Sequence, residues 1–395
     1  MKVQNQQNIK VNNLMLVLRL IKEQRGREIS RADIAKLTKM SATSISRIVD
    51  NLVRAGMVKE TSPITAGRVG RKGTWLVLQN DKIRSLGISI DSDRLGMCIL
   101  DFTDQILEEE TYRLQREAYQ PEQILQFLFE MYEKLFERCG ISQKAVKSIG
   151  ISCIGNIDPV QGKIYFAPQF GWNEVDFASL AEKYFSGPVF MENDMKAATV
   201  SVVRNSGQMA EGGVTYLSIG MGVGSSVYMD GKVLRGYNNA LGEVGHLFIH
   251  PHGRLCDCGQ RGCVQTSLTI NSLIEICHEN GKDVEDLEEI IRLYRKGEPW
   301  MAAFVKERAM DLTYLIRNLI YMYNTEYILV GGALIVKFPE LFELALEKLP
   351  QYVHPNLLRG LKIVKAETEN NSLSGAAMIA QERYVERILR DYKSL

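Results

Sequence analysis

The chain has 395 residues, of which 45% are hydrophobic and 24% are charged, and its formal net charge at pH 7 is +1. These values are typical of soluble globular proteins and leave room for two or three domains with substantial cores. No apolar run approaches the roughly 18 residues that a membrane helix needs, and the N-terminus lacks the apolar core of a secretory signal. We therefore expect a cytoplasmic protein without membrane insertion, and the odd number of cysteines, seven, argues against a disulfide framework.

Charge is distributed unevenly along the chain. Residues 1–80 contain 15 Lys and Arg against 5 Asp and Glu, whereas residues 81–395 contain 33 against 42. A basic segment joined to an acidic one indicates that the basic segment alone has a polyanionic partner. The alternative is a charged, solvated domain without such a partner, and the pattern of apolar residues has to decide between them.

The basic segment predicts three short helices. Apolar residues recur with a helical period over residues 12–24, and Ser30 and Ser41 are suitable N-caps for a second and a third helix. The apolar set of the third helix is Ile45, Ile48, Val49, Leu52 and Val53. The residues left on its outer face are Ala42, Thr43, Ser44, Ser46, Arg47 and Asn51. Such small and polar side chains suit a helix that enters the major groove of DNA.

Two predicted strands, residues 57–61 and 74–78, follow the third helix and are joined by residues 62–73. Three glycines in this connection alternate with three cations, Arg68, Arg71 and Lys72. A thin cationic tip of this kind can contact phosphates or enter a minor groove, although a solvated hairpin is the alternative for the tip alone. The preceding helices favour DNA. We therefore predict that residues 1–80 form a winged helix-turn-helix domain that binds double-stranded operator DNA.

The remaining chain predicts an α/β fold, because short buried strands alternate with helices. The predicted strands include 86–91, 96–101, 148–155, 189–194, 214–219, 225–230 and 327–332. A motif of a different kind lies between the last two of these strands. Glu243-Val-Gly-His246 precedes a run in which Cys256, Cys258 and Cys263 occupy three of eight positions.

These landmarks, in this order, resemble the ROK family, which unites repressors, open reading frames and sugar kinases. The resemblance covers nearly all of residues 81–395. The predicted winged helix-turn-helix at residues 1–80, which we call the head, matches the repressor branch of the family. It implies a two-lobed, actin-like (ribonuclease H-like) domain with one lobe at 81–194 plus the C-terminal helix and the other at 195–373. It also implies a homodimer, with a tetramer as the alternative. We expect the C-terminal helix to pack back toward the first lobe and the head.

The cysteine motif offers three thiolates, which with one imidazole form a closed tetrahedral set for Zn²⁺. The resemblance implies that the four ligands are His246, Cys256, Cys258 and Cys263, whereas His250 and His252 are nearer to the cysteines and are alternatives. Four protein ligands leave no position for a reactive water, so the zinc is expected to be structural. Free thiols in a loop are the other interpretation.

A sugar presents several adjacent hydroxyl groups, for which carboxylates and amides are natural partners. The resemblance implies a sugar site built from Gly155, Asn156, Gln169, Asn193, Asp194, Glu243, His246 and Gln265. Asp194 matches the general base of the family's kinases. Gln265 departs from the family pattern, because the kinases generally have Glu there, and a neutral amide alters the preference for a sugar.

The nucleotide site of the family's kinases is altered in this chain. ROK kinases hold ATP phosphates on an Asp-x-Gly-x-Thr/Ser turn, where glycine lets backbone amides approach the phosphates. Here the run is Asp91-Ser-Asp-Arg-Leu95, with Asp93 at the glycine position and Leu95 at the hydroxyl position. We therefore predict a sugar-responsive transcriptional repressor without catalysis, and a ROK sugar kinase is the alternative. A sugar that closes the lobes of a homodimer would change the spacing of its DNA-binding heads, and relief of DNA binding by free sugar is expected.

Overall fold

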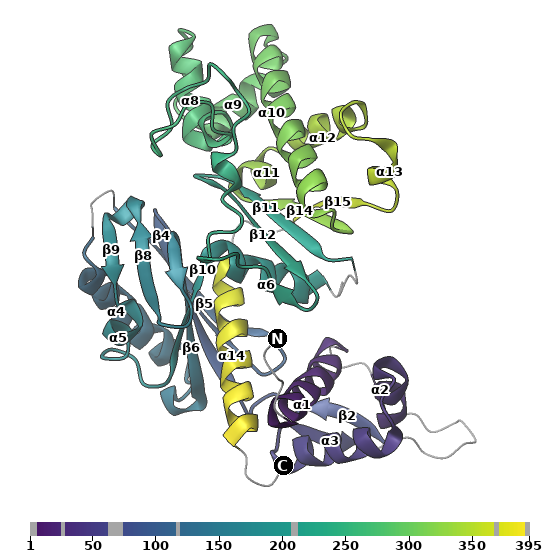
Figure 1. Ribbon diagram of the computed structural model, residues 1–395. Helices are drawn as coiled ribbons and strands as arrows, with labels where there is room; N and C mark the ends of the chain where they lie inside the picture. Colours follow the sequence, from purple (N-terminus) through teal and green to yellow (C-terminus); the bar gives the residue numbers. More distant parts are fainter. Residues whose placement is uncertain are drawn as a thin grey trace. The chain divides into compact units, whose positions relative to one another are not determined.

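The computed structural model describes residues 6–24, 28–61, 74–115, 119–206, 212–366 and 371–391 (Figure 1). The chain consists of two compact units. Unit 1 comprises Met1–Asp194 and Leu373–Leu395, and unit 2 comprises Met195–Ser372. Unit 1 therefore includes the head together with a larger α/β part and the C-terminal helix.

Three helices and a two-stranded antiparallel sheet form the head: α1 (Gln6–Glu23), α2 (Arg31–Thr38), α3 (Ala42–Arg54), β1 (Val58–Thr61) and β2 (Trp75–Leu78). The predicted caps are confirmed, since Ser30 and Asp33 form a capping box and the Ser41 hydroxyl accepts a hydrogen bond from the Ser44 amide. Helix α1 begins earlier than predicted. Its first turn is polar, and hydrophobic periodicity detects only the apolar part of a helix.

The hydrophobic core of the head contains residues that lie far away in the sequence. Leu14, Ile45 and Leu52 from the head pack in one cluster with Phe102 and with two residues of α14 (Ser372–Asp391). The members of this cluster that come from α14 are Val385 and Leu389, both buried. The expectation that the last helix packs against the head is therefore confirmed, and the yellow helix of Figure 1 connects the sheet of unit 1 with the head.

Polar contacts strengthen this junction. The Arg19 guanidinium forms an ion pair with Glu382 at 2.6 Å, and the Lys22 ammonium forms one with Asp104 at 2.7 Å. Lys22 also donates a hydrogen bond to the side chain of Gln381, which is itself buried and donates to the backbone carbonyl of Asp101. Because Lys22 is largely buried, this ion pair is screened less by salt than a surface pair.

The main sheet of unit 1 has the strand order β10-β6-β3-β4-β5. Its bounds are β3 (Arg84–Ile90), β4 (Arg94–Leu100), β5 (Ile106–Arg113), β6 (Val146–Cys153) and β10 (Val189–Asn193). Gly87 and Gly150 lie opposite each other on β3 and β6. A Cβ on Gly87 would approach the Leu373 carbonyl to 2.5 Å, and one on Gly150 would approach the Ala376 carbonyl to 1.9 Å. The two glycines therefore allow the backbone of α14 to contact the sheet directly.

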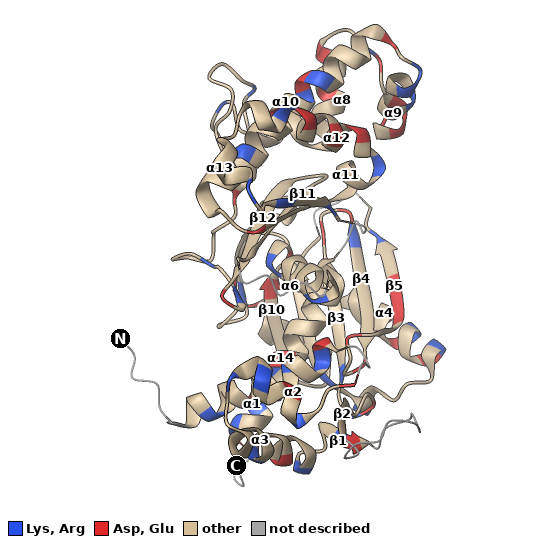
Figure 2. Cartoon of the chain, turned by 90° about the vertical axis from the view of Figure 1, so that its right-hand side faces the viewer, with Lys and Arg blue, Asp and Glu red and all other residues tan. Residues whose placement is uncertain are grey.

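Helix α4 (Pro121–Cys139) contributes Ile124, Leu125 and Leu128 to a second core cluster with the strands of this sheet. The edge strand β5 carries three consecutive glutamates, Glu108–Glu110, visible as the red segment of β5 in Figure 2. Charges on an edge strand discourage pairing with another sheet. The other elements of unit 1 are β7 (Asn156–Asp158), β8 (Lys163–Ala167), β9 (Trp172–Val175) and α5 (Phe177–Ala181), of which the strands form a separate antiparallel sheet.

The sheet of unit 2, in the order β13-β12-β11-β14-β15, repeats the topology of the sheet of unit 1. In both, three strands form an antiparallel meander. A fourth strand then pairs in parallel with the first, and a fifth pairs in parallel with the fourth. The strands are β11 (Val214–Ile219), β12 (Val223–Met229), β13 (Lys232–Val233), β14 (Tyr327–Gly331) and β15 (Lys362–Lys365). This duplication supports the expected two-lobed, actin-like fold.

Helices complete unit 2 and provide its largest core cluster. They are α6 (Asp194–Ser206), α7 (Gln265–Leu268), α8 (Ile270–Glu279), α9 (Leu287–Arg295), α10 (Pro299–Tyr323), α11 (Ala333–Lys337), α12 (Pro339–Lys348) and α13 (Pro355–Leu358). The long helix α10 buries Leu312, Leu315 and Leu319 in this core. Within the described residues, no helix has both the length and the apolar character needed to cross a bilayer.

Candidate functional site

The predicted DNA-reading residues lie on the first two turns of α3. Ala42, Thr43 and Arg47 are exposed, and Ser44 and Ser46 are half-buried. The prediction that Asn51 faces outward is wrong, because this residue is only 4% exposed and its side-chain oxygen accepts a hydrogen bond from Arg54. Asn51 lies about one turn beyond the exposed Arg47, where α3 packs against the rest of the head. Figure 2 shows the Lys and Arg positions on the helices of the head in blue.

Arg31 fixes α3 against the rest of the head. Its guanidinium, on α2, forms ion pairs with Asp50 of α3 at 2.7 Å and with Glu60 of β1 at 2.8 Å. It also donates a hydrogen bond to the backbone carbonyl of Ser46 at 3.0 Å. One side chain thus links α2, α3 and β1. The three predicted wing cations, Arg68, Arg71 and Lys72, lie outside the described residues.

The structure brings together the predicted zinc ligands in unit 2. The potential ligand atoms of His246, Cys256, Cys258 and Cys263 all lie within 4.8 Å of one another. Nδ1 of His246 is 3.7 Å from Sγ of Cys256, and Sγ of Cys258 is 3.7 Å from Sγ of Cys263. With Zn–S bonds of about 2.3 Å, donor atoms around a tetrahedral ion are separated by about 3.8 Å. The chemistry and the spacing of the four donors therefore fit Zn²⁺.

Burial affects the thiols of this cluster differently. Burial and the neighbouring thiols raise the pKa of Cys263 to about 12, whereas a hydrogen bond from the Gln260 backbone is the main factor that lowers the pKa of the exposed Cys258. The loop is held by short backbone pairings, Phe248 with Cys263 and Leu255 with Arg261, rather than by regular strands. Metal ligation would add to these backbone contacts, because one ion would bind both His246 and the three cysteines.

The two alternative histidines are placed differently from His246. Nε2 of His250 lies 2.8 Å from a carboxylate oxygen of Asp311, and neither His250 nor His252 belongs to the ligand cluster found among the described residues. Asp311, on α10, is 1% exposed, and burial raises its pKa while Arg308 and His250 oppose the shift. Sequence spacing did not reveal this contact, because His250 and Asp311 are 61 residues apart.

Several predicted sugar ligands gather in unit 1. The Asn193 amide group, at the end of β10, donates hydrogen bonds to the Gly155 carbonyl at 3.0 Å and to the Asp194 carboxylate at 2.8 Å. The side-chain oxygen of Asn156 is buried and makes no hydrogen bond with the described protein atoms. Gln169 is exposed. Gly155 has φ of +100°, and a Cβ there would lie 2.3 Å from the Phe166 carbonyl, so the fold itself requires glycine.

The remaining predicted sugar ligands belong to unit 2. Glu243 and His246 are exposed, at the start of the short 3-10 helix Val244–His246 and at its end. The Gln265 amide group, at the start of α7, donates a hydrogen bond to Sγ of Cys256 at 3.3 Å. The sequence does not predict this contact. It links Gln265, which departs from the family pattern, to Cys256 of the thiol cluster.

The altered phosphate turn is a tight connection between β3 and β4. Leu95 pairs with Ile90 and is fully buried in the core of unit 1, so an apolar side chain replaces the expected hydroxyl there. Asp93 lies in the turn near Arg94, and burial raises the pKa of Asp91. In unit 2, Gly332 has φ of +89° and a Cβ there would approach the Ile219 carbonyl to 2.4 Å. Packing alone accounts for this glycine.

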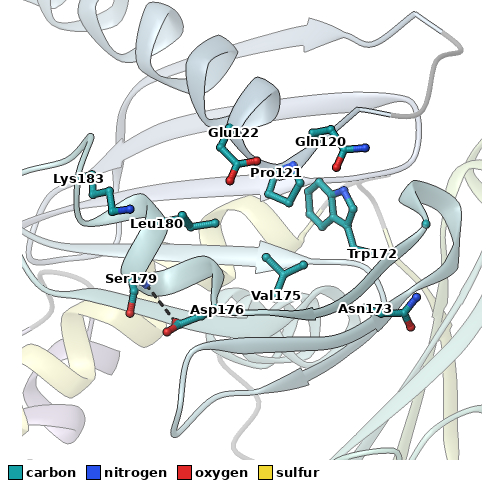
Figure 3. A pocket seen from close by; sticks show the side chains of 11 residues that line it. Gln120, Pro121, Glu122, Trp172, Asn173, Val175, Asp176, Ser179, Leu180 and Lys183 are labelled. Atoms are coloured by element: carbon teal, nitrogen blue, oxygen red, sulfur yellow. Dashed lines mark hydrogen bonds between the residues drawn. The ribbon is translucent and has the colours of Figure 1, made fainter.

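A surface pocket of about 670 Å³ opens in unit 1 at the start of α4 (Figure 3). Its lining residues are Gln120, Pro121, Glu122, Gly171, Trp172, Asn173, Val175, Asp176, Ser179, Leu180 and Lys183. None of the predicted sugar ligands belongs to this set. The Trp172 indole is largely buried, donates a hydrogen bond to the Tyr119 carbonyl and stacks on Phe170. It thus ties β9 to the segment that precedes α4.

Comparison of the full chain with known repressors gives matches over nearly its whole length. The xylose repressor of Caldicellulosiruptor bescii is 27% identical over 361 residues, which cover 88% of each chain. The DNA-binding transcriptional repressor Mlc of Escherichia coli strain K12 is 24% identical over 393 residues, which cover 95% of this chain and 94% of Mlc.

Solved structures show the same fold. A ROK family transcriptional regulator, described as a homolog of E. coli Mlc, superposes with a TM-score of 0.81 and 24% identity over 96% of this chain and 98% of its own. A ROK family glucokinase from Streptomyces griseus, solved with glucose and AMPPNP, gives a TM-score of 0.61 at 22% identity and covers 75% of this chain and 99% of its own.

Sequence profiles of two families match separate parts of the chain. The MarR family profile matches residues 15–68, which include α2 and α3 of the head. The ROK family profile matches residues 85–383, which include both five-stranded sheets and the thiol cluster. The N-terminal domain is therefore a MarR-like helix-turn-helix, and by the match over most of its length the chain belongs to the ROK family.

Proposed function

We propose that this protein is a sugar-responsive transcriptional repressor of carbohydrate-utilisation genes. The observation that carries the proposal is the shared core of the head: Leu389 and Val385 of α14 pack with the DNA-reading helix α3, while the start of α14 packs on the sheet that leads to Asn193. One helix thus touches both the head and the sheet that carries Asn193. The names of the relatives, which include xylose repressors, support the same function.

The proposed DNA contacts come from α3 and from the wing. Ala42, Thr43, Ser44, Ser46 and Arg47 read bases, and Arg68, Arg71 and Lys72 bind phosphates. The proposed partners are operator DNA, a small sugar and a second copy of the chain, in the cytoplasm. Asp93 and the buried Leu95 support a role without ATP-dependent catalysis, because the turn offers a carboxylate where phosphates would approach.

Arg47→Ala is expected to weaken binding to operator DNA by roughly 5-fold to 150-fold, because one good side-chain contact to a base contributes about 1–3 kcal/mol. The operator is first selected from a pool of random duplexes, and affinity is then measured by fluorescence anisotropy. Arg138→Ala removes the same charge from the exposed surface of α4 and serves as the control. Equal affinities of the two variants for the selected duplex would contradict the assignment of α3 as the reading helix.

The proposed sugar ligands are Gly155, Asn156, Gln169, Asn193, Asp194, Glu243, His246 and Gln265. The orphan oxygen of Asn156 supports this assignment in unit 1, because a buried acceptor without a partner is unfavourable unless a ligand or water completes it. Structural Zn²⁺ would be held by His246, Cys256, Cys258 and Cys263. The ion would thereby fix the position of His246, which is also one of the proposed sugar ligands.

Asp194→Asn is expected to abolish the response to sugar while leaving operator binding in the absence of sugar unchanged. The Asn193–Asp194 pair presents a carboxylate that accepts hydrogen bonds from hydroxyls, and an amide loses the charge that strengthens them. Calorimetry against pentoses, hexoses and their phosphates, with and without operator, identifies the effector. Sugar-dependent conversion of ATP to ADP by the wild type, with formation of a sugar phosphate, that disappears in Asp194→Asn would instead establish the kinase.

A further inference from the structure

His250 connects the thiol loop to the helical core of unit 2. The loop between His246 and Cys263 contains no helix or strand of four or more residues, so its conformation depends on individual contacts. Nε2 of His250 lies 2.8 Å from Oδ1 of Asp311, which is buried on α10. The second carboxylate oxygen of Asp311 lies 3.3 Å from Nε of Arg308, itself only 5% exposed. The loop is thus attached to a charged group that the core holds in place.

The backbone of His250 contacts Gly262, the residue that precedes the proposed zinc ligand Cys263. The amides of Ile249 and His250 donate to the Gly262 carbonyl at 3.0 and 3.3 Å, and the His250 carbonyl accepts from the Gly253 amide at 3.0 Å. Gly262 precedes Cys263 and has φ of +81°, and a Cβ on it would lie 1.9 Å from the His250 carbonyl oxygen. The position of the His250 backbone therefore determines where the Gly262–Cys263 segment can lie.

We propose that the His250–Asp311 contact is a positioning device for the metal site, which holds Cys263 at its ligating position through Gly262. The proposal rests on the proposed function, because it requires that the thiol cluster binds Zn²⁺. Groups that orient metal ligands without touching the metal typically change metal affinity by about 10-fold to 100-fold when removed. His250 reaches the ligand through its own backbone, and Asp311 fixes its imidazole.

The test measures the zinc affinity of the full-length protein by competition with a chelator of known affinity. His250→Ala removes the contact with Asp311 and is expected to bind zinc about 10-fold to 100-fold more weakly. His250→Gln keeps a side-chain amide near the place of Nε2, which can still donate to Asp311, and is expected to restore most of the affinity. His252→Ala removes the exposed neighbouring imidazole and is expected to match the wild type.

Thermal unfolding with and without zinc separates positioning from a general loss of stability. His250→Ala leaves the buried Asp311 with one partner fewer, so the zinc-free protein is also expected to melt earlier. A positioning role additionally requires that zinc raises the melting temperature of His250→Ala by less than that of the wild type. Equal zinc affinities of His250→Ala and His252→Ala would overturn the proposal. Wild-type protein that takes up no zinc would instead remove the metal from the proposed function.

Discussion

Leu389→Ala is expected to destabilise the DNA-binding head, although this residue lies more than 300 positions beyond it in the sequence. The side chain is fully buried in the cluster that also contains Leu14, Ile45 and Leu52 of the head. Truncation of a buried leucine to alanine costs about 2–5 kcal/mol, because apolar contacts are lost and a cavity remains. Amides of α1 and α3 should therefore exchange with solvent faster, and affinity for operator DNA should fall.

Two variants make this experiment specific. Arg387→Ala changes an exposed residue of the same helix and is expected to shift stability by no more than about 0.5 kcal/mol. Leu389→Met nearly conserves the side-chain volume and should retain most of the stability. The zinc content of the protein reports on unit 2 and should be the same in Leu389→Ala, Arg387→Ala and Leu389→Met as in the wild type. If the amides of α1 and α3 exchange at the same rates in Leu389→Ala as in the wild type, α14 contributes nothing to the core of the head in solution.

Cys256→Ser is expected to reduce zinc content from one ion per chain to a small fraction and to lower the melting temperature of unit 2. Sγ of Cys256 lies in the four-donor cluster, and a serine hydroxyl is a much poorer zinc ligand than a thiolate. A ligand present at 100 times its dissociation constant contributes about 2.7 kcal/mol to stability. For a unit of this size the loss corresponds to about 5–10 °C.

Cys139→Ser makes the same chemical change in α4, where the half-buried thiol of Cys139 donates to the Phe136 carbonyl at 3.8 Å. It should retain one zinc ion per chain and the wild-type response to metal. Metal content is measured on protein purified without chelators, and unfolding is followed by calorimetry. Wild-type protein without zinc, or Cys256→Ser with a full complement of zinc, would contradict the assignment of the cluster as a metal site.

Local patterns in the sequence predicted the elements that depend on neighbouring residues. The caps at Ser30 and Ser41 and the strands that end at Asn193 and Gly331 were identified because hydrophobic period and capping chemistry act over a few positions. The spacing of Cys256, Cys258 and Cys263 likewise indicated a metal site. Asn51 was assigned to the wrong face, because a polar residue in a helix can be buried when a partner such as Arg54 satisfies it.

The sequence by itself determined the helix-turn-helix, the alternation of strands and helices, and the three thiols of the proposed zinc site, since each is specified by residues close together in the chain. The C-terminal helix is expected to lie toward the head, but only the tertiary structure decided that its Val385 and Leu389 enter the core of the head. It alone also showed that Gly87 and Gly150 admit this helix to the sheet and that His250 binds Asp311. These contacts join residues from 61 to more than 300 positions apart. No short-range pattern encodes them, because they follow from how whole elements pack.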